Sequence, residues 1–368
     1  MHIAFYAPLK PPDDPVVSGD RTMARLLLAA LRRAGHKTVV VSRLRSFDGT
    51  GDRHRQAAIA ALGERAAARL IGRWRQRPEL APQLWFTYHL YYKAPDWLGP
   101  PVAAALGIPY IVAEASHAAK RAGGPWAMGH RAVERAVRQA DAVIGLNSAD
   151  RDGVLPLLAA PERWVALPPF LDAARYTALR RPPAAAPRLI AVAMMRAGDK
   201  LASYRVLGAA LSRLLDRPWS LEIVGDGAAR AEVERALALL GNRVSYTGRL
   251  DVAAVEARLA AADLFVWPAI NEAFGLALLE AQASGLPVVA GASGGVADIV
   301  EDGVTGRLAP PGDLERFAAA VRDLLDDPAA RSRMGAAARD KVLRQHDLRA
   351  AAVRRGAMVE QLGRARAA

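Results

Sequence analysis

Residues 264–290 read LFVWPAINEAFGLALLEAQASGLPVVA. The run opens with four apolar residues, Leu264–Trp267, which predict a buried strand. Asn271 and Glu272 are residues that can cap a helix start, so a helix is expected after them. Gly285 and Pro287 then end this helix, and a second apolar strand is expected over Pro287–Ala290. A strand, a helix and another strand in this order predict a parallel sheet.

The same alternation extends outward in both directions. Each predicted strand is followed by helix-like sequence, such as Thr22–Ala34 after the first strand, which indicates sheets covered by helices on both faces. The other predicted strands are His2–Tyr6, Thr38–Ser42, Leu84–Tyr88, Tyr110–Ala113, Ala142–Leu146, Leu189–Met194, Leu221–Val224 and Val244–Tyr246.

The alternation stops once, at the Pro- and Ala-rich stretch Tyr176–Arg188. We therefore expect two domains joined by a linker. The predicted ranges are 1–172 for the first domain, 173–188 for the linker, 189–345 for the second domain and 346–368 for a C-terminal helix that packs back toward the first domain. The predicted fold class is α/β, with two Rossmann-like domains whose parallel sheets face a central cleft.

Composition limits the possible functions. The chain has 368 residues, which fits two domains, and it has no cysteine, which excludes disulfides, thiolate metal sites and cysteine nucleophiles. No apolar stretch is long enough to span a membrane and the N-terminus does not resemble a secretory signal, so we expect a cytoplasmic protein. The net charge of +13 favours anionic partners, although abundant Ala and Arg also suit a GC-rich genome.

The loop and helix after Trp267 carry the most specific chemistry. Gly275 lets the backbone approach a ligand closely, and the amides of Phe274, Gly275 and Leu276 would face an anion at a helix start. Glu272 and Glu280 are eight positions apart, a rotation of about 80° on a helix, so they do not form a catalytic dyad. We expect Glu272 in the loop and Glu280 in the helix, each accepting hydrogen bonds from different hydroxyls of one extended ligand.

This segment resembles glycosyltransferase family 4. The family signature of two Glu residues separated by seven others, with Phe-Gly after the first, occurs here as Glu272-Ala-Phe-Gly-Leu-Ala-Leu-Leu-Glu280. The resemblance continues through Ala-Ser-Gly-Leu-Pro-Val-Val-Ala, Gly294-Gly295, Glu301–Gly306 and Asp313. It implies the B-type fold of two Rossmann-like domains and a donor site for a nucleotide-diphosphate sugar in the C-terminal half.

Further donor-side residues follow from the resemblance. Arg196 and Lys200 would neutralise the donor diphosphate and stabilise it as a leaving group, as the charges of an Arg and a Lys allow. The spacing between them is slightly shorter than is usual in the family. Gly225 in Val224-Gly-Asp-Gly227 would line the donor site, and the backbone at Arg249 and Leu250 would read the base.

The N-terminal half supplies the expected acceptor side. Gly19, before Asp20 and Arg21, stands where the family has a Gly-Gly pair and would contact donor or acceptor, although Ser18 and Asp20 equally suit a helix cap. His117 matches a family position near the reacting sugar carbon and is a candidate catalytic residue together with Glu272, Arg196 and Lys200. His89 and Arg21 are further acceptor-side candidates.

Residues 53–77 contain seven Arg and one Glu. Ile59, Leu62, Ala66, Leu70 and Trp74 recur at helical spacing and predict one apolar face. A basic amphipathic helix can lie on an anionic membrane at the inner face, and a helix packed on its own sheet gives the same pattern.

The resemblance implies a retaining transfer without metal or cofactor, from a nucleotide-sugar donor to a hydroxyl of a glycan, a lipid-linked acceptor or a small molecule. The letters Asp150-Arg-Asp152 also occur in metal-dependent transferases, but here they suit a helix start after Ser148. A nucleotide-sugar epimerase or hydrolase of the same fold is the alternative. A basic nucleic-acid-binding protein is a distant one, since no basic-aromatic motif supports it.

Overall fold

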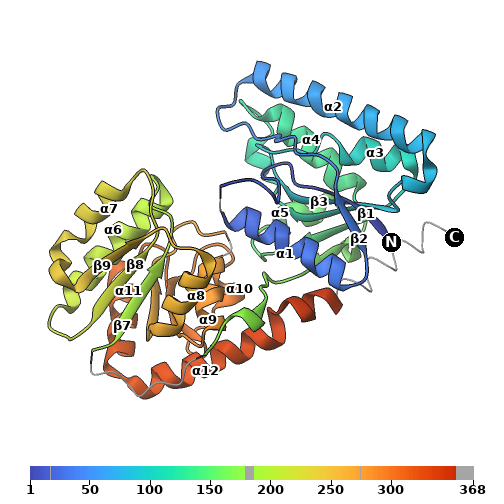
Figure 1. The fold of residues 1–368 in the computed structure, drawn as a ribbon. Coiled ribbons are helices and arrows are strands. Elements are labelled where there is room, and N and C mark those ends of the chain that lie inside the picture. Colours follow the sequence, from blue (N-terminus) through green and yellow to red (C-terminus); the bar gives the residue numbers. More distant parts are fainter. Residues whose placement is uncertain (17, 179–185, 274, 354–368) are drawn as a thin grey trace. The chain divides into compact units, whose positions relative to one another are not determined.

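The computed structural model describes residues 1–16, 18–178, 186–273 and 275–353. These residues form two compact units, the first made of residues up to Pro168 with residues 348–353 and the second of Pro169–Asp347. Each unit is built on a six-stranded parallel sheet (Figure 1). The predicted fold class, two Rossmann-like domains, is confirmed, and the expected cleft between them stays a prediction.

The sheet of the first unit has the strand order β2-β1-β3-β4-β5-β6. Strand β4 is buried along its whole length, as expected for a parallel strand covered on both faces. The strands are β1 (His2–Tyr6), β2 (Lys37–Val40), β3 (Leu84–Leu90), β4 (Tyr110–Ala115), β5 (Ala142–Gly145) and β6 (Trp164–Ala166).

Helices cover both faces of this sheet. Helices α2, α3 and α4 pack on one another, and they cover one face over a core that includes Tyr6, Trp85 and Val112. Helix α1 lies on the other face (Figure 1). The helices are α1 (Gly19–Arg33), α2 (Arg53–Gln76), α3 (Gly99–Leu106), α4 (Ala127–Gln139) and α5 (Arg151–Val154), with short 3-10 turns at Pro78–Leu80, Ala119–Arg121, Leu155–Leu157 and Pro161–Arg163.

The sheet of the second unit has the order β12-β11-β10-β7-β8-β9. Its strands are short and, apart from the sheet edges, largely buried. They are β7 (Arg188–Val192), β8 (Ser220–Val224), β9 (Val244–Gly248), β10 (Leu264–Trp267), β11 (Val288–Gly291) and β12 (Gly306–Ala309).

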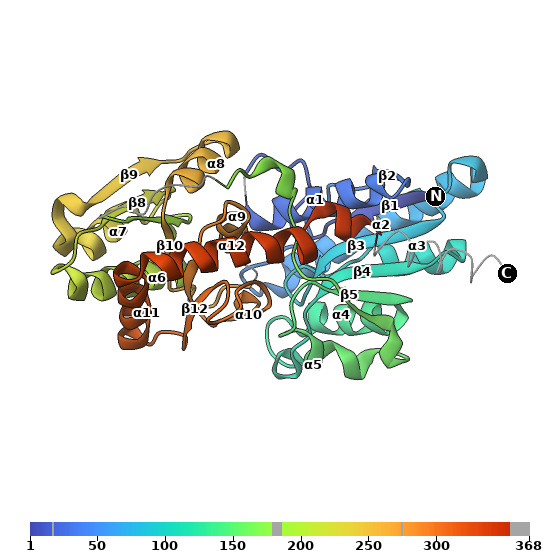
Figure 2. The ribbon, with the colours of Figure 1, turned by 90° about the horizontal axis from the view of Figure 1, so that it is seen from below.

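Two groups of helices cover this second sheet. Helices α7 and α11 each contact α6 in one group, and α8, α10 and α12 each contact α9 in the other. Figure 2 shows α12 running beside α9. The helices are α6 (Asp199–Leu211), α7 (Arg230–Leu237), α8 (Val252–Ala261), α9 (Leu276–Ala283), α10 (Val296–Ile299), α11 (Leu314–Asp326) and α12 (Pro328–Gln345), with 3-10 turns at Ala173–Arg175, Ser212–Leu214 and Ala238–Arg243.

The units divide at Pro168–Pro169, four residues before the predicted end of the first domain. Ala173 and Tyr176, inside the predicted linker, are buried in the second unit. The Ala173 N–H donates to Asp347 Oδ1 at 3.1 Å, which holds this segment to the end of α12. Residues 179–185 of the predicted linker and 354–368 of the predicted C-terminal helix lie outside the described residues, and 348–353 are helical.

The predicted apolar face of residues 53–77 is rotated by about one residue. Helix α2 buries Ala60, Gly63, Ala67 and Trp74, while Leu62 is 44% exposed. Small side chains determine which face of α2 is buried. A Cβ on Gly63 would lie 2.4 Å from Trp97 Cβ, so only glycine allows the helix to approach Trp97 this closely. Within the described residues, no helix has the length and apolar character needed to cross a bilayer.

Candidate functional site

The second unit has a topological switch point between β7 and β10. These strands pair side by side, but the chain continues from β7 to β8 on one side and from β10 to β11 on the other. The loops after β7 and β10 therefore diverge at the carboxyl edge of the sheet, which leaves a crevice where ligands of such folds bind. These loops hold Arg196 and the segment from Pro268 to Gly275, and Lys200 follows in the first turn of α6.

Lys200 and Glu272 meet at this switch point. Lys200 Nζ forms an ion pair and hydrogen bond with Glu272 Oε2, and both side chains are mostly buried. The indole N–H of Trp267 donates to the same carboxylate oxygen at 3.3 Å, and Lys200 Nζ lies 5.4 Å from the centre of the Trp267 ring. The ammonium is thus fixed between a carboxylate and an aromatic face beside the expected diphosphate site.

The helix-capping role expected for Asn271 and Glu272 is wrong. The Asn271 side chain donates to Asp199 Oδ2 at 2.9 Å and Glu272 pairs with Lys200, while Gly275 is the N-cap of α9. Both residues are used instead to hold the loop after β10 against α6. Ala269 and Asn271 have positive φ angles of 52° and 50°, a strained conformation for non-glycine residues that this anchoring maintains.

Helix α9 starts without a side-chain cap. Gly275 adopts the left-handed conformation at φ 69°, and its carbonyl accepts from the N–H groups of Leu278 and Leu279. A Cβ at Gly275 would lie 2.5 Å from Leu278 Cδ1, so a side chain there conflicts with the helix start. The amides of Leu276 and Ala277 have no acceptor within the helix, as at any helix N-terminus, and are available to an anion. Phe274 lies outside the described residues.

Glu280 lies one turn into α9, as the sequence predicts. Its carboxyl group forms a hydrogen bond with the Tyr176 hydroxyl. Burial is the largest effect on Glu280 and raises its pKa to about 7, although the Tyr176 bond opposes this. When ionised, the carboxylate is a strong acceptor for ligand hydroxyls.

Gly225 brings the loops after β7 and β8 together. At φ 144° its N–H donates to Gly248 O at 2.9 Å, and a Cβ there would lie 1.9 Å from Ala193 O. A side chain at position 225 would therefore push the loop after β7 away. This contact explains why a glycine occupies the position. Arg196 and Arg249 are exposed, and Leu250 is half-buried. The ligand contacts expected of these residues stay predictions.

The first unit has its own switch point, between β1 and β3. His89, near the end of β3, hydrogen-bonds through Nδ1 to Asp20 Oδ1 at 3.1 Å, in the first turn of α1. Ser18 caps this helix by accepting from the Arg21 N–H, which supports the capping interpretation of the segment. Gly19 is the first residue of α1, and the Arg21 guanidinium donates to Asp14 O at 2.9 Å, so it braces its own loop.

Sequence reasoning missed a buried charged cluster around His89. Glu114 Oε2 lies 3.7 Å from His89 Nδ1, and both residues have positive φ angles at their strand ends. Burial lowers the pKa of His89, but the Glu114 charge and the Asp20 bond outweigh it and raise the pKa to about 9. Burial raises the pKa of Glu114 to about 8, although the His89 charge opposes this. An acidic residue inside the apolar strand Tyr110–Ala115 was the available signal.

His117 packs against helix α4 of the first unit. Its Nδ1 hydrogen-bonds to Gly153 O at 3.1 Å, and its ring lies 4.6 Å from that of His130 on α4. Burial and the neighbouring His130 lower its pKa, which favours the neutral imidazole. Asp150 does not cap α5, because its carboxylate accepts from the Ser116 hydroxyl and from Asn147 Nδ2.

An aromatic and cationic cluster follows His89 in the chain. The rings of Tyr92 and Trp126 are 5.7 Å apart edge to face, with Lys93 Nζ 4.8 Å from the Trp126 ring and the Arg121 guanidinium 5.1 Å from the Tyr92 ring. All four side chains are half-buried. Flat rings with neighbouring cations suit the apolar faces and anionic substituents of sugars.

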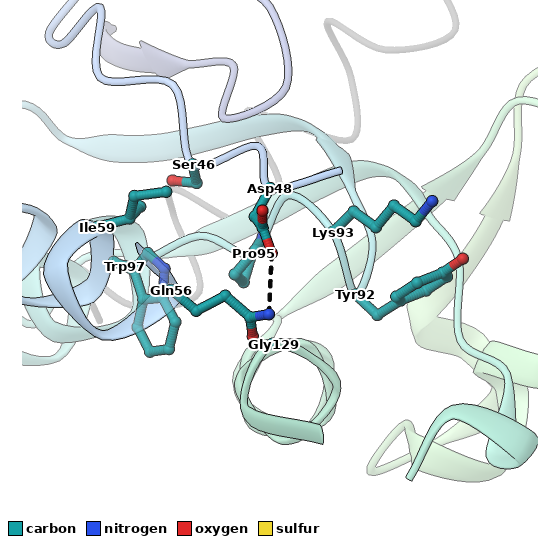
Figure 3. A pocket seen from close by; sticks show the side chains of 9 residues that line it. All are labelled: Ser46, Asp48, Gln56, Ile59, Tyr92, Lys93, Pro95, Trp97 and Gly129. Carbon is teal, nitrogen blue, oxygen red and sulfur yellow. Dashed lines mark hydrogen bonds between the residues drawn. The ribbon is translucent and has the colours of Figure 1, made fainter. Parts of the chain in front are cut away.

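A small cavity adjoins this cluster (Figure 3). Its volume is about 10 Å³, which is room for one water molecule. Gln56 Nε2 donates to Asp48 Oδ2 at 2.9 Å across it, and the Trp126 indole donates to Asp48 O at 3.1 Å. The cavity is thus part of the hydrogen-bonded support behind Tyr92 and Lys93, and it is too small for a sugar.

Residues 187–341 match the model of the family described as glycosyl transferases group 1. The alpha-D-kanosaminyltransferase of Streptomyces kanamyceticus is 32% identical over 244 residues, which cover 63% of this chain and 63% of that enzyme. The chain therefore spans less than two thirds of that relative's length.

Solved structures share the fold of the whole chain. Sucrose-phosphate synthase from Thermosynechococcus elongatus superposes with a TM-score of 0.74 at 22% identity and covers 99% of both chains. Anabaena HepE, solved in complex with UDP, superposes with a TM-score of 0.74 at 17% identity and covers 98% of this chain and 100% of its own. Residues 187–341 of this chain therefore match the glycosyl transferases group 1 family, and the chain has the B-type glycosyltransferase fold of these solved structures.

Proposed function

We propose that this protein is a glycosyltransferase that moves a sugar from a nucleotide-diphosphate donor to an acceptor hydroxyl, and that the donor binds at the switch point of the second unit. The observation that carries this proposal is the pairing of Lys200 with Glu272 beside the uncapped start of α9. These groups lie within the segment that matches the family.

The donor diphosphate binds to the positive groups at this edge of the sheet. The Lys200 ammonium, the Arg196 guanidinium and the amides of Leu276 and Ala277 offset its charge. Glu272 keeps Lys200 in place before the donor arrives, so less side-chain entropy is lost on binding. As the sugar bond breaks, negative charge grows on the leaving phosphate, and the same groups stabilise it more strongly than in the ground state.

The sugar and nucleoside parts of the donor bind to the two glutamates and to nearby backbone. Glu280, opposite Tyr176, accepts hydrogen bonds from ribose hydroxyls, and Glu272 accepts from hydroxyls of the transferred sugar. The backbone at Arg249 and Leu250 contacts the base, and Gly225 keeps the donor side of the β8 loop free of side chains. The complex of the structural relative HepE with UDP supports a uridine nucleotide as the first donor to test.

Transfer proceeds with retention of configuration and without a metal at the diphosphate. The family match supports retention, and the cations at the donor site can supply the charge that a metal supplies elsewhere. The leaving phosphate takes the proton of the acceptor hydroxyl.

The acceptor binds in the first unit, near its own switch point. His89 is held between Asp20 and Glu114, and the Tyr92–Trp126 platform with Lys93 and Arg121 follows it. These groups suit an acceptor that offers a sugar ring, as a glycan or lipid-linked saccharide does. His117 is given no part in this step, because its Nδ1 bonds to Gly153 O and its Nε2 is buried.

Contact with an anionic membrane is proposed for α2. All six of its arginines are exposed, as is Leu62, and a hollow of about 460 Å³ beside the helix is lined by Leu70, Arg73 and Trp74. Peripheral attachment at the inner face of a membrane follows. These arginines are Arg53, Arg55, Arg65, Arg69, Arg73 and Arg75. Cosedimentation with phosphatidylglycerol vesicles at physiological salt, but not with neutral vesicles, is the expected result, and absence of pelleting contradicts it.

The deciding experiment combines ligand screening with product analysis. Nucleoside diphosphates are ranked by the shift they cause in the unfolding temperature, and the matching sugar nucleotides are then incubated with pooled saccharide and lipid-saccharide acceptors. Mass spectrometry should find an acceptor heavier by one sugar residue. Release of free sugar or an isomerised donor without transfer would instead support the hydrolase or epimerase alternative.

A further inference from the structure

Three side chains in the first unit form a cluster that the proposed transfer does not use. His117 follows β4, whereas His130 and Glu134 lie one turn apart on α4. One ring nitrogen of each histidine and one carboxylate oxygen of Glu134 all lie within 4.8 Å of one another. Residues at positions i and i+4 of a helix share one face, so His130 and Glu134 both point toward His117.

The histidines in this cluster have buried nitrogens without protein partners. His130 is 3% exposed, and neither of its ring nitrogens makes a hydrogen bond within the described part of the chain. His117 Nδ1 bonds to Gly153 O, which fixes the proton on Nδ1 and leaves a lone pair on Nε2, also buried and without a hydrogen bond there. Buried polar atoms are nearly always paired, so this arrangement calls for a ligand that accepts lone pairs.

We propose that His117, His130 and Glu134 bind a divalent transition-metal ion of the zinc class. Two imidazole nitrogens and one carboxylate oxygen are a ligand set that Zn²⁺ takes in proteins, with a water molecule as the fourth ligand. The backbone bond at His117 Nδ1 is the outer-shell contact that orients metal-binding histidines. The ligand atoms around a tetrahedral Zn²⁺ ion lie about 3.3 Å apart. Rotation of the three side chains would bring their ligand atoms from the observed spacing to this distance.

The ion would tie the loop after β4 to α4. It would be separate from the donor diphosphate, which the proposed function assigns to the second unit. Glu134 is partly exposed, so an ion can reach the cluster from solvent on this side. Glu134 Oε1 accepts a hydrogen bond from Arg138 at 2.7 Å, so one carboxylate oxygen can hold Arg138 while the other binds the metal. The expectation of no metal rested on the family resemblance, and His130 and Glu134 come to lie beside His117 only in the fold.

The test uses full-length protein without a histidine tag, treated with EDTA and dialysed, in the absence of donor and acceptor. Titration with Zn²⁺ should show one equivalent bound, and Co²⁺ should give the intense visible absorption of tetrahedral coordination. Zn²⁺ should also raise the unfolding temperature. His130→Ala should weaken Zn²⁺ binding at least 100-fold, and Glu134→Gln, a change on the half-exposed side of the cluster, at least 10-fold.

His54→Ala is the matched control, because His54 is exposed and outside the cluster, and it should bind Zn²⁺ like the original protein. Each variant must unfold cooperatively at a similar temperature without metal. Substoichiometric binding, or binding that survives both His130→Ala and Glu134→Gln, overturns the proposal. Because donor and acceptor are absent, neither result depends on the transferase assignment.

Discussion

Replacing Lys200 with alanine tests the donor site most selectively. The substitution removes one cation from the diphosphate and leaves Glu272 bonded only to the Trp267 indole. Loss of one charge-assisted hydrogen bond costs about 1.5–3 kcal/mol of binding, a factor of roughly 10–150 in the Kd of the nucleoside diphosphate. Because charge grows on the leaving phosphate, turnover should fall further, by roughly 100- to 1,000-fold.

The effect on folding should be small by comparison. About a sixth of each side chain in the ion pair is exposed, at 17% and 18%, so its loss should cost about 1–2 kcal/mol of unfolding free energy. Arg213→Ala is the matched control, since Arg213 forms an exposed ion pair with Glu315 at 2.7 Å away from the site. Lys200→Arg keeps the charge and should recover part of the activity.

Calorimetry of nucleoside diphosphate binding and initial rates of transfer measure both effects. A Lys200→Ala variant with a Kd and a turnover within threefold of the original protein would refute the reasoning. So would an Arg213→Ala variant that loses activity equally, because the loss would then reflect general damage to the unit.

Three further predictions concern Glu280, Gly225 and His89. An ionised carboxylate accepts hydrogen bonds from ribose hydroxyls more strongly than a protonated one, and burial raises the pKa of Glu280 to about 7. The affinity for UDP-glucose should therefore rise by up to about tenfold from pH 6 to pH 8 by calorimetry, and Glu280→Gln should abolish that rise. Gly225→Ala should lower the urea midpoint of the second unit through about 1–3 kcal/mol of overpacking, whereas Gly312→Ala, with positive φ but open space, should cost less. His89, with a pKa raised to about 9, binds a proton more tightly in the folded protein than in the unfolded one. The stability that this proton contributes is therefore complete below about pH 6.5 and is lost as the pH rises toward 9. His89→Gln should flatten that part of the pH–stability curve measured by urea unfolding.

Much of the fold could be predicted because its strands are continuous apolar runs. The bounds of Leu264–Trp267 and His2–Tyr6 were predicted to the residue, because parallel strands buried on both faces are short apolar runs. The edge strands Trp164–Ala166 and Gly306–Ala309 were missed. They are short, and half-exposed positions in them weaken the apolar signal.

The candidate site was predictable where local sequence determines it. Gly275 and Glu280 lie at the helix start and one turn later, as the spacing of the motif requires. The partners of these residues were not predictable, because Tyr176 and Lys200 reach Glu280 and Glu272 across many intervening residues. For the same reason the Asn271 contact with Asp199 was mistaken for a helix cap.

Amide hydrogen exchange with and without the best-binding nucleoside diphosphate tests the donor site most directly, because it locates the ligand on the chain. The account predicts slower exchange in two peptides, one covering the loop after β7 up to Lys200 and one covering the loop after β10 and the first turn of α9. Protection confined to other segments, at ligand concentrations that saturate binding, would contradict it.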